Sequence, residues 1–207
     1  VERADKLTGN TYLDITAPSK ALVESGAAFA DGELKAVAIV EGGDATITKL
    51  ILPGVGNAKV AMDVLNETGL STYLQEQVSK GTPLLGICLG MQLLLETSEE
   101  GNVECLGFLK GSVPEFKDIA EKIPHMGWNK LNLAKADPIF KYIEAGDYMY
   151  FVHSFYARNC VENTLAFAEY GVAVPAIVKS GSVYGMQFHP EKSGAKGLAL
   201  LKAFSEI

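Results

Sequence analysis

Cys88 has the clearest setting for covalent chemistry in this sequence. It ends a predicted strand at residues 83–88, and Gly86 and Gly90 stand two positions to either side of it. A helical pattern follows over residues 90–98, so we expect a sharp strand-to-helix turn whose small neighbours let the backbone lift a nucleophile out of the sheet. The thiolate is the reactive form of cysteine. A cysteine buried as a small apolar residue fits the same pattern about equally well.

His189 and Glu191 are candidates for an acid–base pair. A predicted strand at residues 183–188 delivers the histidine, and Pro190 fixes the following turn. An imidazole that takes a proton from a thiol needs an acceptor at its other nitrogen, which a nearby carboxylate supplies. The sequence thus predicts Cys88 as nucleophile, His189 as base and Glu191 as orienting group. A surface or capping histidine is the alternative, because sequence spacing alone does not bring the three side chains together.

A glycine-rich turn is a third candidate for chemistry. Residues 53–57 read Pro-Gly-Val-Gly-Asn, between a predicted strand and a predicted helix. Backbone N–H groups in such a turn can stabilise an oxyanion, and losing one donor typically raises the barrier by about 2.7–4 kcal/mol. A phosphate loop is excluded, because the Gly-x-x-x-x-Gly-Lys-Ser/Thr pattern is absent. A tight turn without chemistry remains the alternative.

The elements that must position these residues follow an α/β pattern. Short apolar runs rich in Val, Ile and Leu alternate with segments of helical period, as expected for strands that helices bury on both faces. The predicted strands are 36–40, 49–52, 83–88, 148–153, 176–178 and 183–188, and the predicted helices are 18–25, 59–67, 70–80, 90–98 and 195–206. The expected fold is a layered α/β domain over residues 1–207, with a mixed, mostly parallel sheet flanked by helices.

Length and composition exclude several classes of function. The chain has 207 residues, 48% of them hydrophobic, and a net charge of −7. This suits one domain and argues against a nucleic-acid partner, since such proteins concentrate positive charge. No apolar run approaches the roughly 20 residues of a membrane helix, and the start does not resemble a secretory signal. Three widely spaced cysteines favour a cytoplasmic location. The three histidines lack the spacing of zinc ligands, so no metal site is predicted, and no cofactor is expected either.

Three motifs taken together resemble a known family. They are the glycine turn at 53–56, the nucleophile segment at 86–92 and the run Gln-Phe-His-Pro-Glu at 187–191. In combination they resemble the class I, or triad, glutamine amidotransferases. Within that class, residues 124–129, 150–156 and 189–194 look like the glutaminase subunit of imidazole glycerol phosphate synthase, a histidine-biosynthesis enzyme. The resemblance runs from about Leu50 to the C-terminus.

The resemblance implies glutamine hydrolysis through a covalent thioester. Cys88 would attack the side-chain amide, His189 would carry the proton to the leaving ammonia, and Glu191 would orient the imidazole. The oxyanion would be received by the N–H of Leu89 and by the turn at Gly54 and Val55, after a peptide flip in that turn. The implied glutamine contacts are Gly54, Gly56, Gln92, Ser154 and Phe155. Glu100 is a further implied contact whose match to the family is weaker.

The resemblance also implies a partner protein. Ammonia would pass to a (β/α)8-barrel cyclase subunit in a heterodimer. There it would react with a phosphoribulosyl-formimino aminoimidazole ribotide, giving imidazole glycerol phosphate and an aminoimidazole carboxamide ribotide. The residues expected to face this subunit are His125, Met126, Gly127, Trp128, Asn129 and Lys192. Trp128, the single tryptophan, is a residue type enriched in interface hot spots, with a buried core aromatic as the alternative.

Two other functions stay open at this point. An amidotransferase subunit of another synthase would share the triad, although residues 89–92 and 124–129 favour the histidine pathway. A non-catalytic, partner-binding subunit is the third hypothesis, against which the intact triad argues.

The N-terminal region departs from the family. Residues 1–48 match poorly, because residues 1–8 are too polar for the buried first strand that the family uses. Gly9 and Asn10 are candidates for the turn after it, and residues 26–32 predict a loop without a family counterpart. An altered first strand would expose a sheet edge and change one side of the glutamine pocket.

Overall fold

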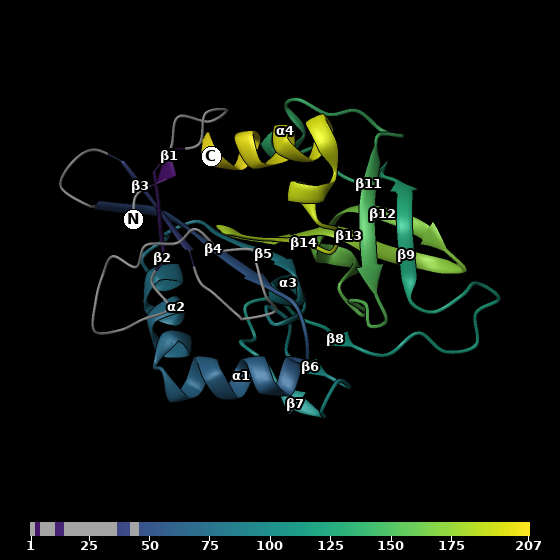
Figure 1. Ribbon diagram of the computed structural model, residues 1–207, viewed down its shortest axis with the longest axis horizontal. Coiled ribbons are helices and arrows are strands. Elements are labelled where there is room, and N and C mark those ends of the chain that lie inside the picture. Colours follow the sequence, from purple (N-terminus) through teal and green to yellow (C-terminus); the bar gives the residue numbers. More distant parts are fainter. Residues whose placement is uncertain (1–2, 5–10, 15–36, 42–45) are drawn as a thin grey trace.

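A mixed sheet of nine strands forms the centre of the protein (Figure 1). The computed structural model describes residues 3–4, 11–14, 37–41 and 46–207. The strands lie in the order β1-β2-β3-β4-β5-β14-β13-β12-β10. In that order their bounds are Arg3–Ala4, Thr11–Asp14, Val37–Glu41, Thr46–Gly54, Leu84–Cys88, Val183–Met186, Val172–Ser180, Thr164–Tyr170 and Asn132–Leu133.

Parallel pairing is confined to the middle of this sheet. β4 pairs in parallel with β5, and β5 with β14, whereas the other pairings among its described strands are antiparallel. The predicted α/β class and mixed sheet are confirmed, but the sheet is less parallel than expected. The reason is local: tight turns join β12 to β13 and β13 to β14, and a tight turn can only join antiparallel neighbours.

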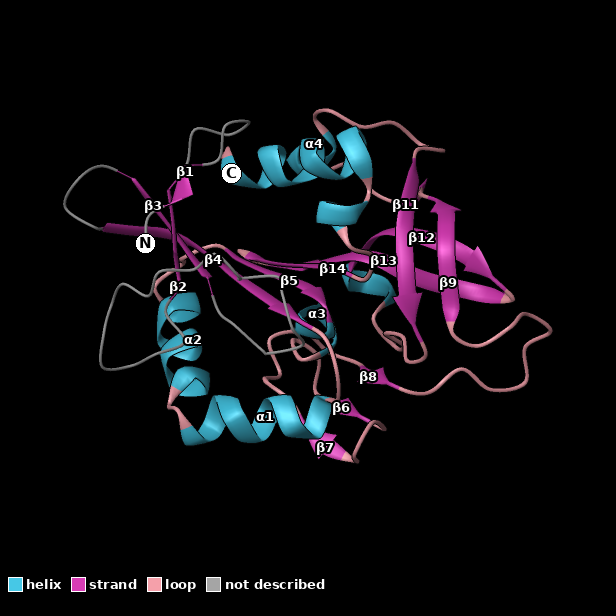
Figure 2. Cartoon of the chain, in the orientation of Figure 1, coloured by secondary structure: helices cyan, strands magenta, loops and turns pink. Residues whose placement is uncertain are grey.

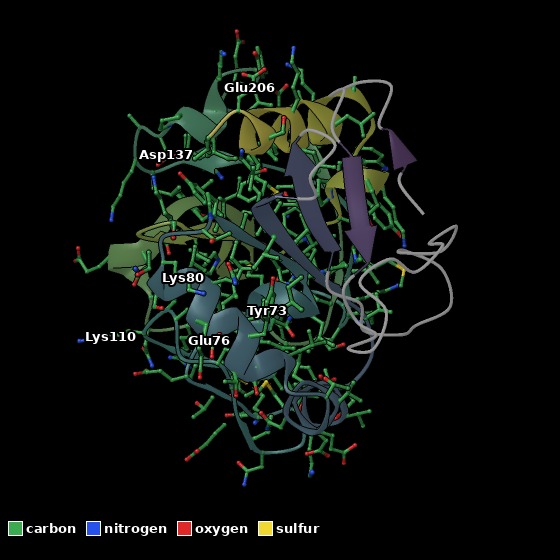
Figure 3. All side chains as sticks on the ribbon, turned by 90° about the vertical axis from the view of Figure 1, so that its left-hand side faces the viewer. Tyr73, Glu76, Lys80, Lys110, Asp137 and Glu206 are labelled. Atoms are coloured by element: carbon green, nitrogen blue, oxygen red, sulfur yellow. The ribbon has the colours of Figure 1, made fainter. Side chains whose placement is uncertain are left out.

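Helices cover both faces of the sheet. α1 (Ala58–Glu67), α2 (Leu70–Ser79) and α3 (Leu89–Gln92) lie on one face, and α4 (Gly194–Ser205) lies on the other (Figure 1). Alternate residues of β4 serve the two faces, because Leu50 and Leu52 pack in the core beneath α1 and α2 while Ile51 packs in the core beneath α4. Figure 3 shows this layering from the side, with Tyr73 of α2 and Glu206 at the end of α4 on opposite sides of the sheet.

Three predicted helices are confirmed. The predictions at 59–67, 70–80 and 195–206 correspond to α1, α2 and α4, with ends that differ by one residue. The start of α1 is fixed by Asn57, whose side-chain oxygen accepts hydrogen bonds from the backbone N–H groups of Lys59 (3.0 Å) and Val60 (3.2 Å). Such an N-cap satisfies donors that the first helical turn leaves unpaired.

The predicted helix at 90–98 is wrong beyond Gln92, where α3 ends. Leu93, Leu94 and Leu95 are all fully buried. Three consecutive residues point in different directions on a helix, so the chain leaves the helix to bury them all. It then forms a small sheet of β6 (Thr97–Ser98), β7 (Val103–Glu104) and β8 (Ser112–Val113).

A separate two-stranded antiparallel sheet is formed by β9 (His125–Lys130) and β11 (Tyr148–His153), at the right in Figure 2. β11 was expected, whereas β9 and β12 were not. The sequence of β9 contains glycine and asparagine and no β-branched residue, so local propensity does not mark it as a strand. In β12 the strand-favouring Thr164, Phe167 and Tyr170 are mixed with two alanines and a glutamate, which weakens the strand signal. Short 3-10 helices span Pro138–Phe140 (η1), Val161–Asn163 (η2) and Pro190–Lys192 (η3).

Several N-terminal predictions lie outside the described residues. These are the helix at 18–25, the loop at 26–32 and the turn at Gly9 and Asn10. The strand predicted at 36–40 corresponds to β3, and β1 lies at the edge of the sheet rather than at its centre. Among the helices that the structure describes, none has the length and apolarity that crossing a membrane requires.

Candidate active site

Cys88 lies at the end of β5 on the predicted sharp turn. Its φ is 54° and its ψ is −111°, a left-handed conformation that side chains other than glycine rarely adopt. Gly86 and Gly90 make the turn possible, because a Cβ on Gly86 would stand 2.6 Å from the Gly90 oxygen and a Cβ on Gly90 would meet the Leu52 carbonyl. The prediction of a strained strand-to-helix turn flanked by two glycines is confirmed.

His189 and Glu191 reach the same edge of the sheet as Cys88. β14 runs parallel to β5, with Met186 level with Ile87, so both strands deliver their following residues to one edge. The imidazole is almost fully buried, and its Nδ1 lies 2.7 Å from Oε1 of Glu191. The carboxylate accepts, so the proton on Nδ1 is fixed and Nε2 is the nitrogen free to exchange a proton.

The charge of His189 is governed by its two neighbours. Burial lowers its pKa, but Cys88 and the Glu191 carboxylate, through hydrogen bonding first and charge second, raise it more, to about 9. At neutral pH the imidazole therefore carries the proton that a leaving amine would need. Nε2 has no hydrogen bond of normal geometry within the part of the chain that the structure describes.

Ser193 holds the backbone of His189 in place. Its hydroxyl donates to the carbonyl oxygen of His189 at 2.6 Å and accepts from the N–H of Tyr150 at 2.9 Å. The N–H of His189 donates to the carbonyl oxygen of Tyr150 at 2.9 Å. These contacts join the base to β11, and sequence reasoning missed Ser193 because nothing in the sequence brings residue 193 near residue 150.

The glycine turn predicted to stabilise an oxyanion begins beside Cys88. Gly54, the last residue of β4, pairs with Cys88 in the parallel register. Val55 and Gly56 follow on the exposed stretch before α1. Glu100, expected as a weaker glutamine contact, instead accepts a hydrogen bond from the N–H of Ala58 at 2.7 Å, so its carboxylate serves the start of α1.

Two of the predicted glutamine contacts, Gln92 of α3 and Phe155 after β11, lie against each other. The side-chain nitrogen of Gln92 donates to the carbonyl oxygen of Phe155 at 2.9 Å and to the side-chain oxygen of Gln187 at 3.1 Å. Both amide hydrogens of Gln92 are therefore used within the protein. Ser154, partly exposed, accepts at its carbonyl oxygen from the N–H of Phe116 at 3.0 Å.

The comparison with protein families shows the family to which this fold belongs. The family model "Glutamine amidotransferase class-I" matches residues 35–206. The chain belongs to this family. The solved structure of a glutamine amidotransferase from Thermotoga maritima has the same fold, with a TM-score of 0.52 and 19% identity, over 81% of this chain and 66% of that one.

Curated relatives place this amidotransferase in a narrower group. It is 50% identical over 165 residues to imidazole glycerol phosphate synthase subunit HisH of Geobacillus kaustophilus, covering 76% of this chain and 78% of the relative. The subunit of the same name from Geobacillus thermodenitrificans is 45% identical over 207 residues, covering 96% of this chain and 92% of the relative. The amidotransferase is thus a member of the HisH group, and the second alignment extends into residues 1–48.

The β9–β11 sheet of the amidotransferase has two unlike faces. On the outer face, Met126, Trp128 and Tyr148 are 61%, 56% and 49% exposed. On the inner face, His125 is only 2% exposed and lies level with His153 across the strand pair. The outer face is an apolar surface open to solvent, whereas the inner face belongs to the interior.

The residues that were predicted to contact a partner differ in their exposure to solvent. Met126, Trp128 and Lys192 are exposed, and Gly127 and Asn129 are partly exposed. The prediction that the His125 side chain faces a partner does not fit, because strand alternation turns it inward. The alternative for Trp128, a buried core aromatic, is wrong. Among the described residues, no three His, Cys, Asp or Glu side chains gather as a possible metal site.

Proposed function

We propose that this chain is the glutaminase subunit of an imidazole glycerol phosphate synthase, with Cys88 as its nucleophile. The observation that carries the proposal is the position of Cys88 on a strained turn, at the sheet edge where the His189–Glu191 pair also lies. The relatives named HisH favour this synthase over an amidotransferase of another pathway.

The reaction proceeds in two halves. The Cys88 sulfur bonds to the side-chain carbonyl carbon of glutamine, and the C–N bond breaks as the His189 imidazolium gives its proton to the departing nitrogen, which leaves as ammonia. His189 then takes a proton from water, the water oxygen attacks the thioester, and glutamate leaves as the Cys88 sulfur is released. Glu191 holds the imidazole orientation throughout and stabilises its charged form.

Backbone groups beside the nucleophile receive the oxyanion and the substrate. The N–H of Leu89, which follows Cys88, and the turn at Gly54 and Val55 are the proposed oxyanion donors. Their support is the register that sets Gly54 beside Cys88. The proposed glutamine contacts are Gly54, Gly56, Gln92, Ser154 and Phe155, of which Gln92 acts by holding Phe155.

The outer face of the β9–β11 sheet is the proposed docking surface for a (β/α)8-barrel cyclase subunit, in a cytoplasmic heterodimer. An exposed tryptophan next to other apolar side chains is a combination enriched in interfaces. The proposed contacts are the side chains of Met126 and Trp128, the strand backbone at Gly127 and Asn129, and Lys192 on the neighbouring η3. Ammonia passes to that subunit, where the ribotide substrate is converted to imidazole glycerol phosphate and an aminoimidazole carboxamide ribotide.

The test is glutamate release from glutamine by the chain alone and then with a cyclase subunit and its ribotide ligand. Cys88→Ala is expected to lower glutamine-dependent synthesis by more than about 1,000-fold while ammonia-dependent synthesis by the complex persists. Cys160→Ala, which changes another buried free cysteine, should leave both activities unchanged. Loss of both activities in Cys88→Ala contradicts the assigned role. Binding of the cyclase without any glutamate release indicates a non-catalytic subunit instead.

A further inference from the structure

A chain of hydrogen bonds connects the β9–β11 sheet to the active site. Nδ2 of Asn129 lies 3.2 Å from Nε2 of His125, and Nδ1 of His125 lies 3.0 Å from Nε2 of His153. Nδ1 of His153 lies 2.8 Å from the carbonyl oxygen of Phe155. The proposed mechanism uses neither histidine, and both are buried.

The partners at the two ends fix the direction of every hydrogen bond. A carbonyl oxygen can only accept, so His153 carries its proton on Nδ1 and offers a lone pair on Nε2. His125 must then donate from Nδ1 and accept at Nε2. Asn129 supplies that donor, because its Oδ1 accepts from the N–H of Lys130 at 2.8 Å and its Nδ2 also donates to the carbonyl oxygen of Glu169 at 2.9 Å. Both imidazoles are therefore neutral, each in a single tautomer.

Aromatic rings enclose the two imidazoles. His125 stacks between Phe151 and Tyr170, with centroid distances of 4.6 Å and 3.9 Å, and His153 lies 5.4 Å from the ring of Phe116. Burial lowers the pKa of His125 to about 4. Burial, with the charges of His125 and His189, lowers the pKa of His153 to about 3. The surroundings thus favour the neutral rings that the hydrogen bonds require.

The chain ends on an oxygen that holds the catalytic segments together. The carbonyl oxygen of Phe155 also accepts from Gln92, in the helix that begins directly after Cys88. The same amide of Gln92 donates to Gln187, two positions before His189. The Phe155 carbonyl oxygen therefore links the strand that carries His153 to Gln92, in the helix after Cys88. Through Gln92 it is also linked to Gln187, in the segment that leads to His189.

We propose that His153 is a positioning residue of the glutaminase site, held in its donor tautomer by His125, and that it fixes the Phe155 carbonyl and through it Gln92. This inference rests on the proposed function and extends it to two side chains that touch neither glutamine nor the triad. What it requires of His153 is specific: a donor at the Nδ1 position. The acceptor at Nε2 serves only to select the tautomer.

Two substitutions at His153 separate these requirements. Asn places an amide near the position of Nδ1, so His153→Asn can still donate to Phe155. Gln places its amide near the position of Nε2, so His153→Gln keeps a partner for His125 and loses the donor to Phe155. Asn163→Ala is the matched control, because it removes a side-chain hydrogen bond to a backbone oxygen, that of Lys179 at 2.9 Å, away from the site.

The measurements are kcat/KM for glutamine in the complex with the cyclase, ammonia-dependent synthesis, and thermal stability. We expect His153→Gln to lower kcat/KM by about 10-fold, as the loss of one of the two hydrogen bonds to the Phe155 oxygen would, with ammonia-dependent synthesis unchanged. His153→Asn should stay within about threefold of the parent, although both variants are less stable. Asn163→Ala should lose stability alone. Equal loss of kcat/KM in the two His153 variants would overturn the proposal.

NMR of the side-chain amide of Gln92 tests the inference without activity. The Gln92 signals should shift in His153→Gln and stay close to their parental positions in His153→Asn. Unchanged signals in His153→Gln would refute the positioning role even if glutaminase activity were absent for another reason. Conversely, the expected shifts in a chain that releases no glutamate would contradict the proposed function and leave the positioning role supported.

Discussion

His189 is charged at neutral pH because of two neighbouring side chains. Burial alone would keep the imidazole neutral, as it does for His125, whose pKa is lowered to about 4. Cys88 and the Glu191 carboxylate reverse that effect and raise the pKa of His189 to about 9. The same residue type thus serves as a charged acid at one place and a neutral link at another, according to the charges around it.

Glu191→Gln tests the electrostatic part of this account. Removing the carboxylate charge should lower the pKa of His189, so the basic limb of the pH profile of kcat/KM, expected near pH 9, should move down by about 1–2 pH units. The profile is measured with the cyclase bound. Asp63→Asn, which removes an exposed carboxylate that pairs with Lys59 on α1, should leave the limb in place. A basic limb that does not move in Glu191→Gln would contradict the assignment of this carboxylate.

At the residue scale, the members of the proposed triad could be named from the sequence, whereas the residues that hold them in place could not. The glycines beside Cys88 and the His-Pro-Glu run are local features, which a sequence displays directly. Ser193 contacts Tyr150 across 43 positions in the chain, and only the folded backbone creates that contact. His125 was assigned to the wrong side of its strand because the register of β9 and β11 decides which face is buried.

The β5–α3 turn depends on close packing against β4. Gly90 lies where any Cβ would meet the Leu52 carbonyl, whose carbon would be 2.8 Å away. Backbone atoms cannot move aside as a flexible side chain can, so the two elements would have to separate. The strained φ of Cys88 is held by this packing.

Gly90→Ala is expected to lower the free energy of unfolding by about 1–3 kcal/mol and to reduce glutaminase activity, because overpacking displaces the nucleophile. Urea unfolding and glutamate release are the measurements. Gly181→Ala is the control, since its φ of +56° carries a backbone cost of about 1 kcal/mol while no atom lies within 4 Å of the added Cβ. It should lose stability and keep activity. Full activity and stability in Gly90→Ala would mean that the turn does not need this contact.

Element by element, predictions succeeded where the pattern is periodic and failed where tertiary contacts override it. α1, α2 and α4 have one apolar face and were found within a residue of their ends. The Leu93–Leu94–Leu95 run looked helical by composition, yet its complete burial ended the helix. β12 was missed because a sheet can accommodate alanine and glutamate when its neighbours supply the packing.

At the scale of the molecule, the proposed docking surface is the outer side of the β9–β11 sheet. Its register sets Trp128 opposite Tyr150, and their rings meet edge to face with centroids 6.0 Å apart. This arrangement holds the indole in place before a partner arrives, which reduces the ordering cost of binding.

Trp128→Ala is expected to weaken binding of the cyclase subunit by about 30-fold or more, as for an interface hot spot. Titration calorimetry measures the affinity directly. Val161→Ala changes another exposed apolar side chain, one on η2 that is 78% exposed, and should leave the affinity unchanged. An unaltered affinity in Trp128→Ala would remove this residue from the interface.

The buried histidines also set how the stability of the whole molecule depends on pH. For His125 and His153 the folded-state pKa values, about 4 and about 3, lie below the ordinary 6.5. Their neutral forms therefore contribute stability that is present above pH 6.5 and is lost as the pH falls toward 4. For His189 the order is reversed, because its raised pKa gives stability that is present below pH 6.5 and is lost as the pH rises through about 9. The three histidines together predict greatest stability near pH 6.5–7.

Urea unfolding at pH 7 and pH 5 tests the acid side of this prediction. Each buried neutral histidine should lower the free energy of unfolding by about 2 kcal/mol over the 1.5 pH units between 6.5 and 5, because the unfolded chain binds a proton at this histidine and the folded chain does not. His125→Gln removes one of the two groups and should reduce the difference between the two pH values by about half, whatever it does to stability at pH 7. His189→Gln should widen that difference by just under about 1 kcal/mol, because at pH 7 the folded chain keeps the His189 proton that the unfolded chain has mostly lost. An equal pH dependence in His125→Gln and the parent would mean that His125 is not held neutral. The hydrogen bonds from Asn129 through His125 and His153 to Phe155 could then not have the directions assigned above.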